Sequence, residues 1–388
     1  MKLTTFRTVA SIFLAIILSY SCKKSSSNAN GGNSGTENVY VLGAENGMTM
    51  LWKNGVASTL PILVNNNSLY VSGSDVYVAG FTQNSIFGTP FYTKNGIEDS
   101  LPRDSAVGAT GNSVFVAGNT VYVAGTQFYS PDSTTTPFTT LTATYPIAGT
   151  VAAIWTNGVA THLQGYGSPG GAGDSNRFCA SYYDDYVSGI QVAGNDVYVS
   201  GGSHQSQRNN PPSYRFAEYW KNGVPTLLVN GLLDSSANAY SFGAYPTTTG
   251  IAVSGSDVYV SGYELTIGGY PNAIYWKNSV PTYLNTSPAG SGANAITVSG
   301  SDVYVAGYAN INDTSRAIIW KNGVAAILPY GTGSAAANAV FVSGADVYVA
   351  GYGWQIGGYY VSTYWKNGVL TSLTNGQIPA IANSIFVQ

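Results

Sequence analysis

The stretch "ANAITVSGSDVYVAGY" (293–308) contains two short runs of alternating apolar residues, separated by a Gly-Ser turn. Alternation in residues rich in Val, Ile and Tyr is typical of β-strands, and a Gly-containing turn between two such runs is typical of a β-hairpin. The second run recurs as seven similar copies, which begin at residues 38, 75, 120, 196, 257, 302 and 346. Self-similarity at this spacing predicts a repeat architecture.

A second signature, Trp-Lys-Asn-Gly-Val or a close variant, follows each copy. Its anchors are Trp52, Trp155, Trp220, Trp276, Trp320 and Trp365, with Thr93 in the second copy. Asn-Gly between two strands predicts a type I′ turn, in which both central residues have positive φ. Ser279 replaces this Gly once, at a position where a side chain is strained. One repeat is therefore expected to hold four antiparallel strands, A to D, with short A–B and C–D turns and longer B–C and D–A loops.

The two ends of the repeat region hold complementary halves of one repeat. The last residues, "ANSIFVQ" (382–388), match strand A without a following strand B, and "NVYVLGA" (38–44) matches strand B without a preceding strand A. We expect these halves to pair and so to remove an exposed sheet edge. The predicted fold of residues 38–388 is an all-β, seven-bladed β-propeller of four-stranded antiparallel blades, whose first blade is closed by the C-terminal strand.

The repeats resemble a known group of sequences. The pattern "A-x-x-W-K-N-G-V-x-x-x-L", followed by "A-x-x-I-x-V-S-G-x-D-V-Y-V-A-G", resembles extracellular HAF-type repeats. In strand order it is similar to NHL and kelch propellers. The resemblance covers residues 38–388 and implies an architecture only, because one fold serves many functions.

The first residues predict a targeting signal, assigned to residues 1–21. Lys2 and Arg7 precede or border an apolar run, residues 9–18, which is too short to span a bilayer. The residues Ser19-Tyr20-Ser21-Cys22 resemble a bacterial lipoprotein box, although Leu18 stands one position further from the Cys than is usual in such boxes. They are more similar to the looser boxes of Bacteroidetes lipoproteins. The resemblance implies cleavage before Cys22 and acylation of its thiol. The alternative is an ordinary secretory signal with an incidental Cys.

Residues 22–37 are expected to form the acylated Cys and a flexible tether, because they are rich in Gly, Ser and Asn. The lipid would make a membrane the first partner of the protein, and the expected location is the outer membrane, on its periplasmic or cell-surface side. Removal of Lys2 and Arg7 leaves 13 basic residues against 18 acidic ones. This balance argues against nucleic acid as a partner, since phosphate binding needs a basic patch.

Few residues suggest catalysis or a cofactor. The chain has two His and one Cys besides Cys22, namely Cys179, so it has no multi-His metal site and no internal disulfide, and we expect no cofactor. The acidic stretch "YYDDY" (182–186) together with Glu264 could supply the opposed carboxylates of a glycosidase or the oxygen ligands of Ca²⁺. Solvated loop acids are the more common explanation.

A ligand site is expected on the face formed by the B–C and D–A loops, because these loops vary in length over a regular scaffold. Aromatic rings there suit glycans or peptides, and they could alternatively cover strand ends. The aromatic candidates are Tyr182, Tyr183, Tyr263, Tyr308, Tyr352 and Trp354. A second set begins strand A in five repeats and could line the mouth of a central channel or bond the backbone there. Its members are Asn67, Asn112, Asn294, Asn338 and Asn383, with Ser188 and Thr249 in the other two repeats.

The opposite face carries the short turns, whose Asp and Lys residues recur in most repeats. These charges could form a docking ring, but they are better explained as turn residues that bond their own backbone or keep the turn soluble. The expected function is thus a lipid-anchored binding or interaction module of the envelope, with a glycan or peptide ligand. The alternatives are an enzyme, such as a glycan hydrolase or lyase that uses loop-face carboxylates, and a scaffold subunit of an envelope protein complex.

Overall fold

The computed structural model describes residues 37–62, 68–82, 88–104, 106–129, 148–165, 180–207, 214–231, 246–265, 269–284, 286–355 and 358–388. Across these residues the regular elements are 28 β-strands, all within the unit Glu37–Gln388. None of the described residues belongs to a helix long and apolar enough to cross a membrane.

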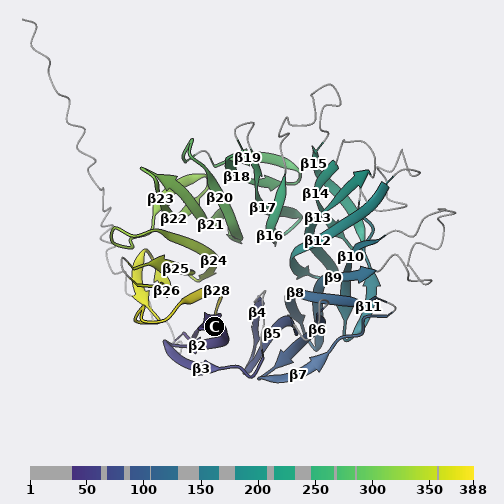
Figure 1. Cartoon of the computed structure of the whole chain (residues 1–388), viewed down its shortest axis with the longest axis horizontal. Coiled ribbons are helices and arrows are strands. Elements are labelled where there is room, and N and C mark those ends of the chain that lie inside the picture. Colours follow the sequence, from purple (N-terminus) through teal and green to yellow (C-terminus); the bar gives the residue numbers. More distant parts are fainter. Residues whose placement is uncertain are drawn as a thin grey trace, which may run out of the picture. The chain divides into compact units, whose positions relative to one another are not determined.

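Five sheets have four antiparallel strands each, in the order inner, second, third and outer strand (Figure 1). The first is β28 (Ala380–Val387), β1 (Val39–Glu45), β2 (Met48–Lys53) and β3 (Val56–Thr59). The next is β4 (Ser68–Ser72), β5 (Asp75–Thr82), β6 (Thr89–Lys94) and β7 (Ile97–Ser100). The third is β16 (Thr247–Ser254), β17 (Asp257–Leu265), β18 (Pro271–Lys277) and β19 (Val280–Tyr283). The fourth is β20 (Ser291–Ser299), β21 (Asp302–Ile311), β22 (Thr314–Lys321) and β23 (Val324–Ile327). The fifth is β24 (Ala335–Ser343), β25 (Asp346–Trp354), β26 (Tyr360–Lys366) and β27 (Val369–Ser372).

The strands expected for the third and fourth repeats form one eight-stranded mixed sheet. It holds β8 (Gly108–Ala117), β9 (Thr120–Tyr129), β10 (Ala148–Thr156), β11 (Val159–His162), β12 (Ala180–Ala193), β13 (Asp196–Gln207), β14 (Tyr214–Lys221) and β15 (Val224–Gly231). The two antiparallel sets are joined by a short parallel pairing of β10 with β12, in which Ala148 to Thr150 lie opposite Tyr182 to Asp184. The structure therefore shows five separate four-stranded blades and this larger sheet.

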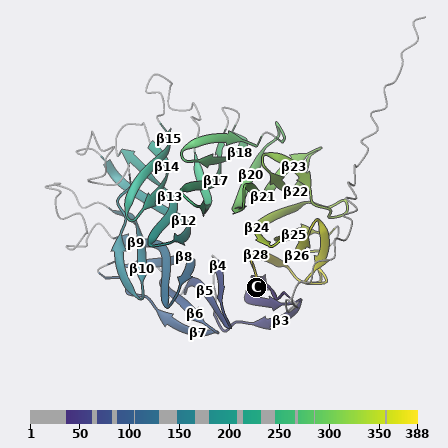
Figure 2. The ribbon, with the colours of Figure 1, turned by 180° about the vertical axis from the view of Figure 1, so that it is seen from behind.

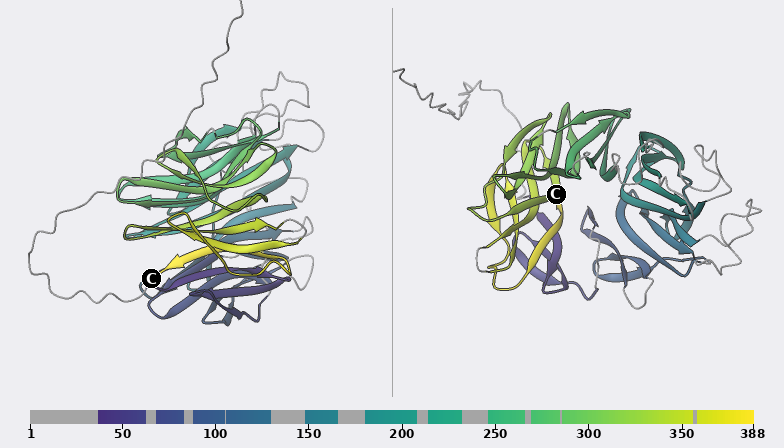
Figure 3. Two further views of the ribbon diagram at one scale, coloured as in Figure 1. Left: turned by 90° about the vertical axis from the view of Figure 1, so that its left-hand side faces the viewer. Right: turned by 45° about the horizontal axis from the view of Figure 1, so that its top comes forward.

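The predicted closure of the first blade is confirmed. The C-terminal strand β28 pairs antiparallel with β1, and Val39 lies opposite Val387. Beyond the strands, Asn38 N–H donates to Gln388 O at 2.7 Å and Gln388 N–H donates to Asn38 O at 3.0 Å. Figure 2 shows the C-terminal end beside the strands of the first blade, and Figure 3 shows the whole set of strands from two further directions. The all-β propeller with four-stranded antiparallel blades is thus observed.

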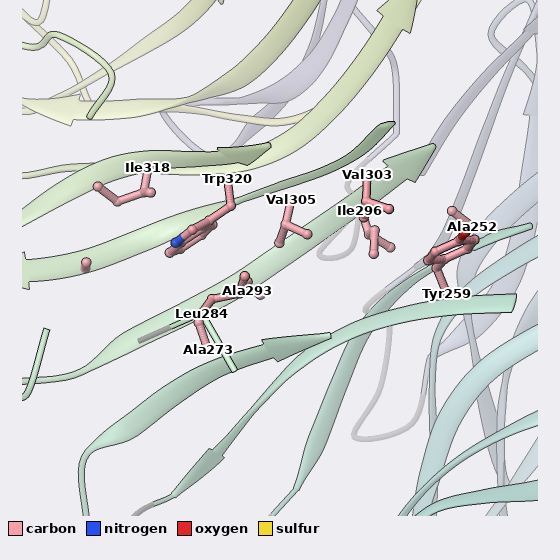
Figure 4. Packing of buried hydrophobic residues seen from close by; sticks show 11 residues of the cluster. Ala252, Tyr259, Ala273, Leu284, Ala293, Ile296, Val303, Val305, Ile318 and Trp320 are labelled. Carbon is pink, nitrogen blue, oxygen red and sulfur yellow. The ribbon is translucent and has the colours of Figure 1, made fainter. Parts of the chain in front are cut away.

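The core lies between neighbouring blades and is anchored by the repeated Trp. All six are at most 1% exposed: Trp52, Trp155, Trp220, Trp276, Trp320 and Trp365. Trp320 of β22 packs with Ala293, Val305 and Ile318 of its own blade and with Ala273 and Leu284 of the blade before it (Figure 4). Its indole N–H donates to Thr286 Oγ1 at 2.8 Å, in the link between the two blades. One residue therefore joins successive repeats by apolar burial and by a hydrogen bond.

The C–D turns have the predicted geometry. Asn54 and Gly55 have φ of 51° and 80°, as a type I′ turn requires, and the same pair of signs recurs in the other Asn-Gly turns. Ser279 has φ of 65°, in the left-handed region where a side chain is strained.

In five repeats an Asp begins strand B, and its partners differ from the predicted ones. Instead of bonding its own backbone, Asp302 accepts from Lys321 Nζ at 2.7 Å and from Asn322 Nδ2 at 2.8 Å, both in the neighbouring C–D turn. Lys321 also lies over the ring of Tyr304, with Nζ 5.3 Å from the centroid. The same Lys–Asp contact recurs at Asp75, Asp196, Asp257 and Asp346. Because strand B begins beside the end of strand C, these residues join the two turns of one blade.

Candidate functional site

A surface cavity of about 590 Å³ lies beside the B–C loop after β25. Three connections contribute to it: the link from β23 to β24, the loop after β25, and the segment after β27. All three belong to the B–C and D–A connections, so the cavity is on the face predicted to hold a ligand. Its lining includes Tyr330, Thr332, Trp354, Gln355, Leu370, Thr374 and Asn375. We call this cavity the loop-face pocket.

A ring contact and a backbone hydrogen bond fix the position of Trp354. Its ring meets Tyr360 edge-on at 4.8 Å between centroids, and Tyr360 meets Tyr352 in the same way at 4.9 Å. The backbone N–H of Trp354 donates to Ser334 O at 2.6 Å. The indole is nevertheless 38% exposed, which is unusual for the largest apolar side chain. A supported and exposed aromatic ring of this kind is suited to stacking against a ligand.

Tyr330 forms the other wall of the loop-face pocket, and it was missed in the sequence. A Cβ on Gly353 would lie 2.1 Å from the Tyr330 ring, so the ring packs directly over that glycine. Arg316 Nη1 donates to the carbonyls of Gly331 and Gly333 at 3.3 Å each and holds the link that carries Tyr330. The signal in the sequence is a single Tyr followed by two glycines, "YGTG" (330–333), which indicates only a loop until the partner Gly353 is known.

The other aromatic candidates are placed differently. Tyr263, Tyr308 and Tyr352 occupy the same position in three successive blades, and burial, followed by the neighbouring phenols of Tyr263 and Tyr352, raises the pKa of Tyr308. These three residues lie near one another but do not line the loop-face pocket. Tyr182 and Tyr183 belong to β12, and their side chains lie outside the described part of the structure.

The described Asn candidates, with the equivalent Ser188 and Thr249, each lie at a β-bulge of an inner strand. The register against the second strand shifts at Asn112, Ser188, Thr249, Asn294, Asn338 and Asn383. A bulge leaves one residue unpaired and turns its side chain away from the ladder. All six bulged residues line a second cavity, of about 580 Å³, among the inner strands. We call it the axial cavity. Asn67 lies outside the described residues.

The bulge also explains the recurrent Gly of the second strand. A Cβ on Gly307 would lie 2.0 Å from the carbonyl oxygen of Gly292, two residues before the bulged Asn294. A Cβ would lie equally close to a carbonyl oxygen of the inner strand at Gly43, Gly125, Gly201, Gly262 and Gly351. The Ala-Gly or Ser-Gly step of the repeat is therefore required by the neighbouring strand.

The bulged side chains bond the backbone of the next blade. Asn112 Nδ2 donates to Val187 O, Asn294 Nδ2 to Ala337 O, and Asn338 Nδ2 to Ala382 O, each at 2.9 Å. Thr249 Oγ1 makes the equivalent bond to Ala293 O at 2.8 Å. The backbone role weighed in the sequence is therefore present, but it joins two blades and does not cap the strand's own start.

Carboxylates are buried in the sheet of β12 to β15 and do not line either cavity. Asp185 is 3% exposed and Glu218 is fully buried, where Ser203 Oγ donates to Glu218 Oε1 at 2.9 Å. Glu264 accepts from Tyr283 OH at 3.0 Å, and burial raises the pKa of Glu264. Among the described residues, no group of three or more His, Cys, Asp and Glu could hold a metal ion. Cys22 and Cys179 lie outside the described residues.

Comparisons with known proteins support the propeller. No family model matches the chain, and no curated protein matches it in sequence. A puromycin hydrolase structure is similar with a TM-score of 0.52 and 11% identity, over 87% of this chain and 52% of that one. A puromycin-hydrolysing peptidase of Mycobacterium tuberculosis gives 0.48 and 11%, over 87% and 53%.

The β-propeller domain of the Trilobed protease from Pyrococcus furiosus gives a TM-score of 0.47 and 9% identity, over 89% of this chain and 96% of that one. The chain thus spans about half of the two hydrolase chains and nearly all of this single domain. At such identities the likeness shows the fold alone. The protein is an all-β propeller with four-stranded antiparallel blades.

Proposed function

We propose that this protein is a binding module of the cell envelope whose loop-face pocket holds a glycan. The observation that carries the proposal is the pair of aromatic walls, Tyr330 and Trp354, on a pocket of about 590 Å³. This volume is within the range of about 300–1,000 Å³ that small-molecule sites occupy. The lining residues include no charged side chain. A peptide is the second ligand class that such a surface suits.

The chemistry of the lining favours a sugar. Aromatic faces pack against the apolar C–H face of a pyranose, and Gln355, Thr332 and Asn375 offer neutral donors and acceptors for hydroxyl groups. A charged ligand would find no opposite charge in this lining and would lose hydration on entry.

A glycan-array screen of the full chain tests the proposal. We expect hits whose binding falls at least about tenfold in Trp354→Ala, since a stacked aromatic is a typical hot spot. The matched control is Tyr270→Ala, which removes an aromatic that is 54% exposed on another B–C loop and does not line the pocket. An array without hits, or equal loss in both variants, would contradict the proposal.

We also propose that Cys22 is acylated and that the loop face points away from the membrane. Glu37, the first described residue, accepts from Ser343 Oγ at 2.6 Å and from Tyr348 OH at 2.5 Å, both beside an A–B turn. The tether therefore joins the domain on the side of the short turns, which supports this orientation. Labelling with radioactive palmitate tests the acylation of Cys22: the wild type should incorporate label and Cys22→Ser should not.

The number of blades is proposed to be seven. The β8–β11 and β12–β15 sets of the eight-stranded sheet each repeat the four-stranded order, and only three residue pairs join them. Both sets carry the buried Trp and the A–B turn of the other blades. An experimental density map that shows one continuous sheet with strong β10–β12 pairing would contradict this count.

The alternatives need other observations. An enzyme would present opposed carboxylates in a cavity, and the described lining residues of both cavities include none. An envelope scaffold would retain a protein partner after crosslinking. Capture of one defined partner through the loop face, unaffected by glycans, would favour the scaffold over the glycan binder.

A further inference from the structure

The axial cavity differs from the loop-face pocket in its walls. Its lining comes from β4, β8, β12, β16, β20, β24 and β28, the inner strand of every sheet and both sets of the larger one. Figure 1 shows these strands around the centre of the ring. The lining is neutral throughout, since it consists of Ser, Thr, Asn, Ala and Val side chains and the phenol of Tyr186.

One layer of this lining offers hydrogen-bond acceptors. The amide nitrogens of Asn112, Asn294 and Asn338 are already bonded to the backbone of the next blade. Their amide oxygens lie at the other end of each side chain. Asn112 Oδ1 is buried and, among the described residues, has no donor. Asn294 and Asn338 line the cavity as well, so this layer favours a molecule that brings donors.

The next layer carries hydroxyl groups on three inner strands and methyl groups on two others. Ser384, Ser68 and Ser113 follow the bulge positions of three adjacent blades, and each hydroxyl oxygen accepts a backbone N–H from the following blade at 3.1–3.3 Å. Ser68 Oγ and Ser113 Oγ also lie 3.4 Å apart, which engages one hydroxyl hydrogen and leaves the others able to donate. In β20 and in β24, which neighbours β28, the same position is Ala295 and Ala339. The cavity therefore combines a polar lining of hydroxyl and amide groups with two methyl groups from neighbouring strands.

We propose that the axial cavity binds a neutral, hydroxyl-rich small molecule of monosaccharide or cyclitol size. Hydroxyl groups both donate and accept, as the amide oxygens and serine hydroxyls require, and the apolar C–H face fits against Ala295 and Ala339. Ions are disfavoured, because the lining has no charge to offset their lost hydration. This site is separate from the loop-face pocket and does not depend on the function proposed above.

The experiment titrates the full chain with glucose and with myo-inositol, by calorimetry and saturation-transfer NMR. The key variant is Ala339→Leu, which fills the cavity and removes no hydrogen bond that involves the bulged Asn. We expect binding of at least one polyol to the wild type, a loss of about tenfold or more in Ala339→Leu, and no change in Tyr270→Ala, whose side chain lines neither cavity. If only Trp354→Ala loses binding, the polyol occupies the loop-face pocket and the axial proposal is overturned.

A second measurement does not depend on a variant that folds. Bound polyol should slow amide hydrogen exchange in the wild type around Ser188 and Asn294, where the bulges line the cavity. No binding of either polyol, or protection confined to the residues near Trp354, would overturn the proposal. Stabilisation by sodium, potassium or ammonium chloride that the polyols do not reproduce would overturn it too, since it would assign the acceptors to a cation.

Discussion

Single residues in the turns carry strain that can be measured. Ser279 has φ of 65°, whereas the equivalent Gly323 has φ of 81° and no atom within 4 Å of the place that a Cβ would occupy. We expect Ser279→Gly to raise the free energy of unfolding by about 0.5–1 kcal/mol, because the left-handed conformation then costs nothing sterically. Urea denaturation measures this. The reverse change, Gly323→Ser, should cost a similar amount, and equal stability of all three proteins would contradict the explanation.

The two histidines predict a decline in stability on mild acidification. Burial lowers the pKa of His162 and, with the charge of Arg215 as a second cause, lowers that of His204. The unfolded chain then binds protons more readily, so stability is complete above about pH 6.5 and falls as the pH drops through the folded-state values. Unfolding at a series of pH values should show this step, and the double variant His162→Asn, His204→Asn should lack it.

A second loss belongs to the turn carboxylates and occurs at lower pH. The contact with Lys221, followed by that with Asn222, holds the pKa of Asp196 below its usual value, and the other paired Asp residues behave alike. Their contribution is present above about pH 4 and is lost as the pH falls through the lowered values. A free energy of unfolding that stays constant from pH 8 to pH 5 in the wild type would contradict the decline assigned to the histidines. It would not contradict the decline assigned to the Asp residues, which occurs at lower pH.

The indole hydrogen bonds between blades have a measurable value. Thr286→Val removes the acceptor of the Trp320 N–H and leaves it buried, at an expected cost of about 1–3 kcal/mol. In a Trp320→Phe background the same change should cost clearly less, because no N–H remains to be satisfied. Denaturation of the four proteins gives the coupling.

At the scale of elements, the bulge and the Gly opposite it act together. Gly307→Ala would place a Cβ 2.0 Å from Gly292 O, and backbone atoms on both strands would have to move. We expect a loss of about 1–3 kcal/mol or more in the free energy of unfolding. The matched variant is Gly323→Ala, which meets no neighbour and adds only backbone strain. A smaller effect at Gly307 than at Gly323 would contradict the assigned contact.

The bulge was also the element that sequence reasoning could not place. The repeat showed that Asn112, Asn294 and Asn338 occupy equivalent positions, and the structure confirms their common location beside the axis. The sequence did not show that each side chain reaches the next blade, because that contact depends on the angle between two sheets. Alternation along the strand predicts its two faces but cannot reveal one extra residue in the ladder.

At the scale of the whole molecule, closure of the first blade by β28 should be essential. Deletion of residues 380–388 leaves one edge of β1 unpaired and exposes Trp52 and Leu42, which are now buried. We expect an aggregated or unfolded product, because an open apolar edge pairs with other chains. Size-exclusion chromatography and circular dichroism measure this, with a chain that starts at residue 37 as the control. A monomeric truncation with cooperative unfolding would contradict it.

The sequence predicted the all-β propeller, its four-stranded antiparallel blades and the closure of the first blade, but not the candidate site. The Asn-Gly turns depend on adjacent residues, and the strand order follows from one pattern that repeats along the chain and is incomplete at residues 38–44 and 382–388. The pairing of β10 with β12 was not predicted, because Ala148 and Tyr182 follow insertions that have no counterpart in the other repeats. Tyr330 was missed for a related reason, since its partner Gly353 belongs to another blade.

The contact between Asn38 and Gln388 has a consequence for how the chain could be reordered. The backbones of these two residues exchange hydrogen bonds at 2.7 and 3.0 Å, so a short linker could join them without moving either strand. A circular permutant opened in the link from β19 to β20 would then split no sheet. Such a protein would keep every strand pairing while losing the interlocking of its two ends, and its unfolding rate would report what that interlocking contributes to kinetic stability.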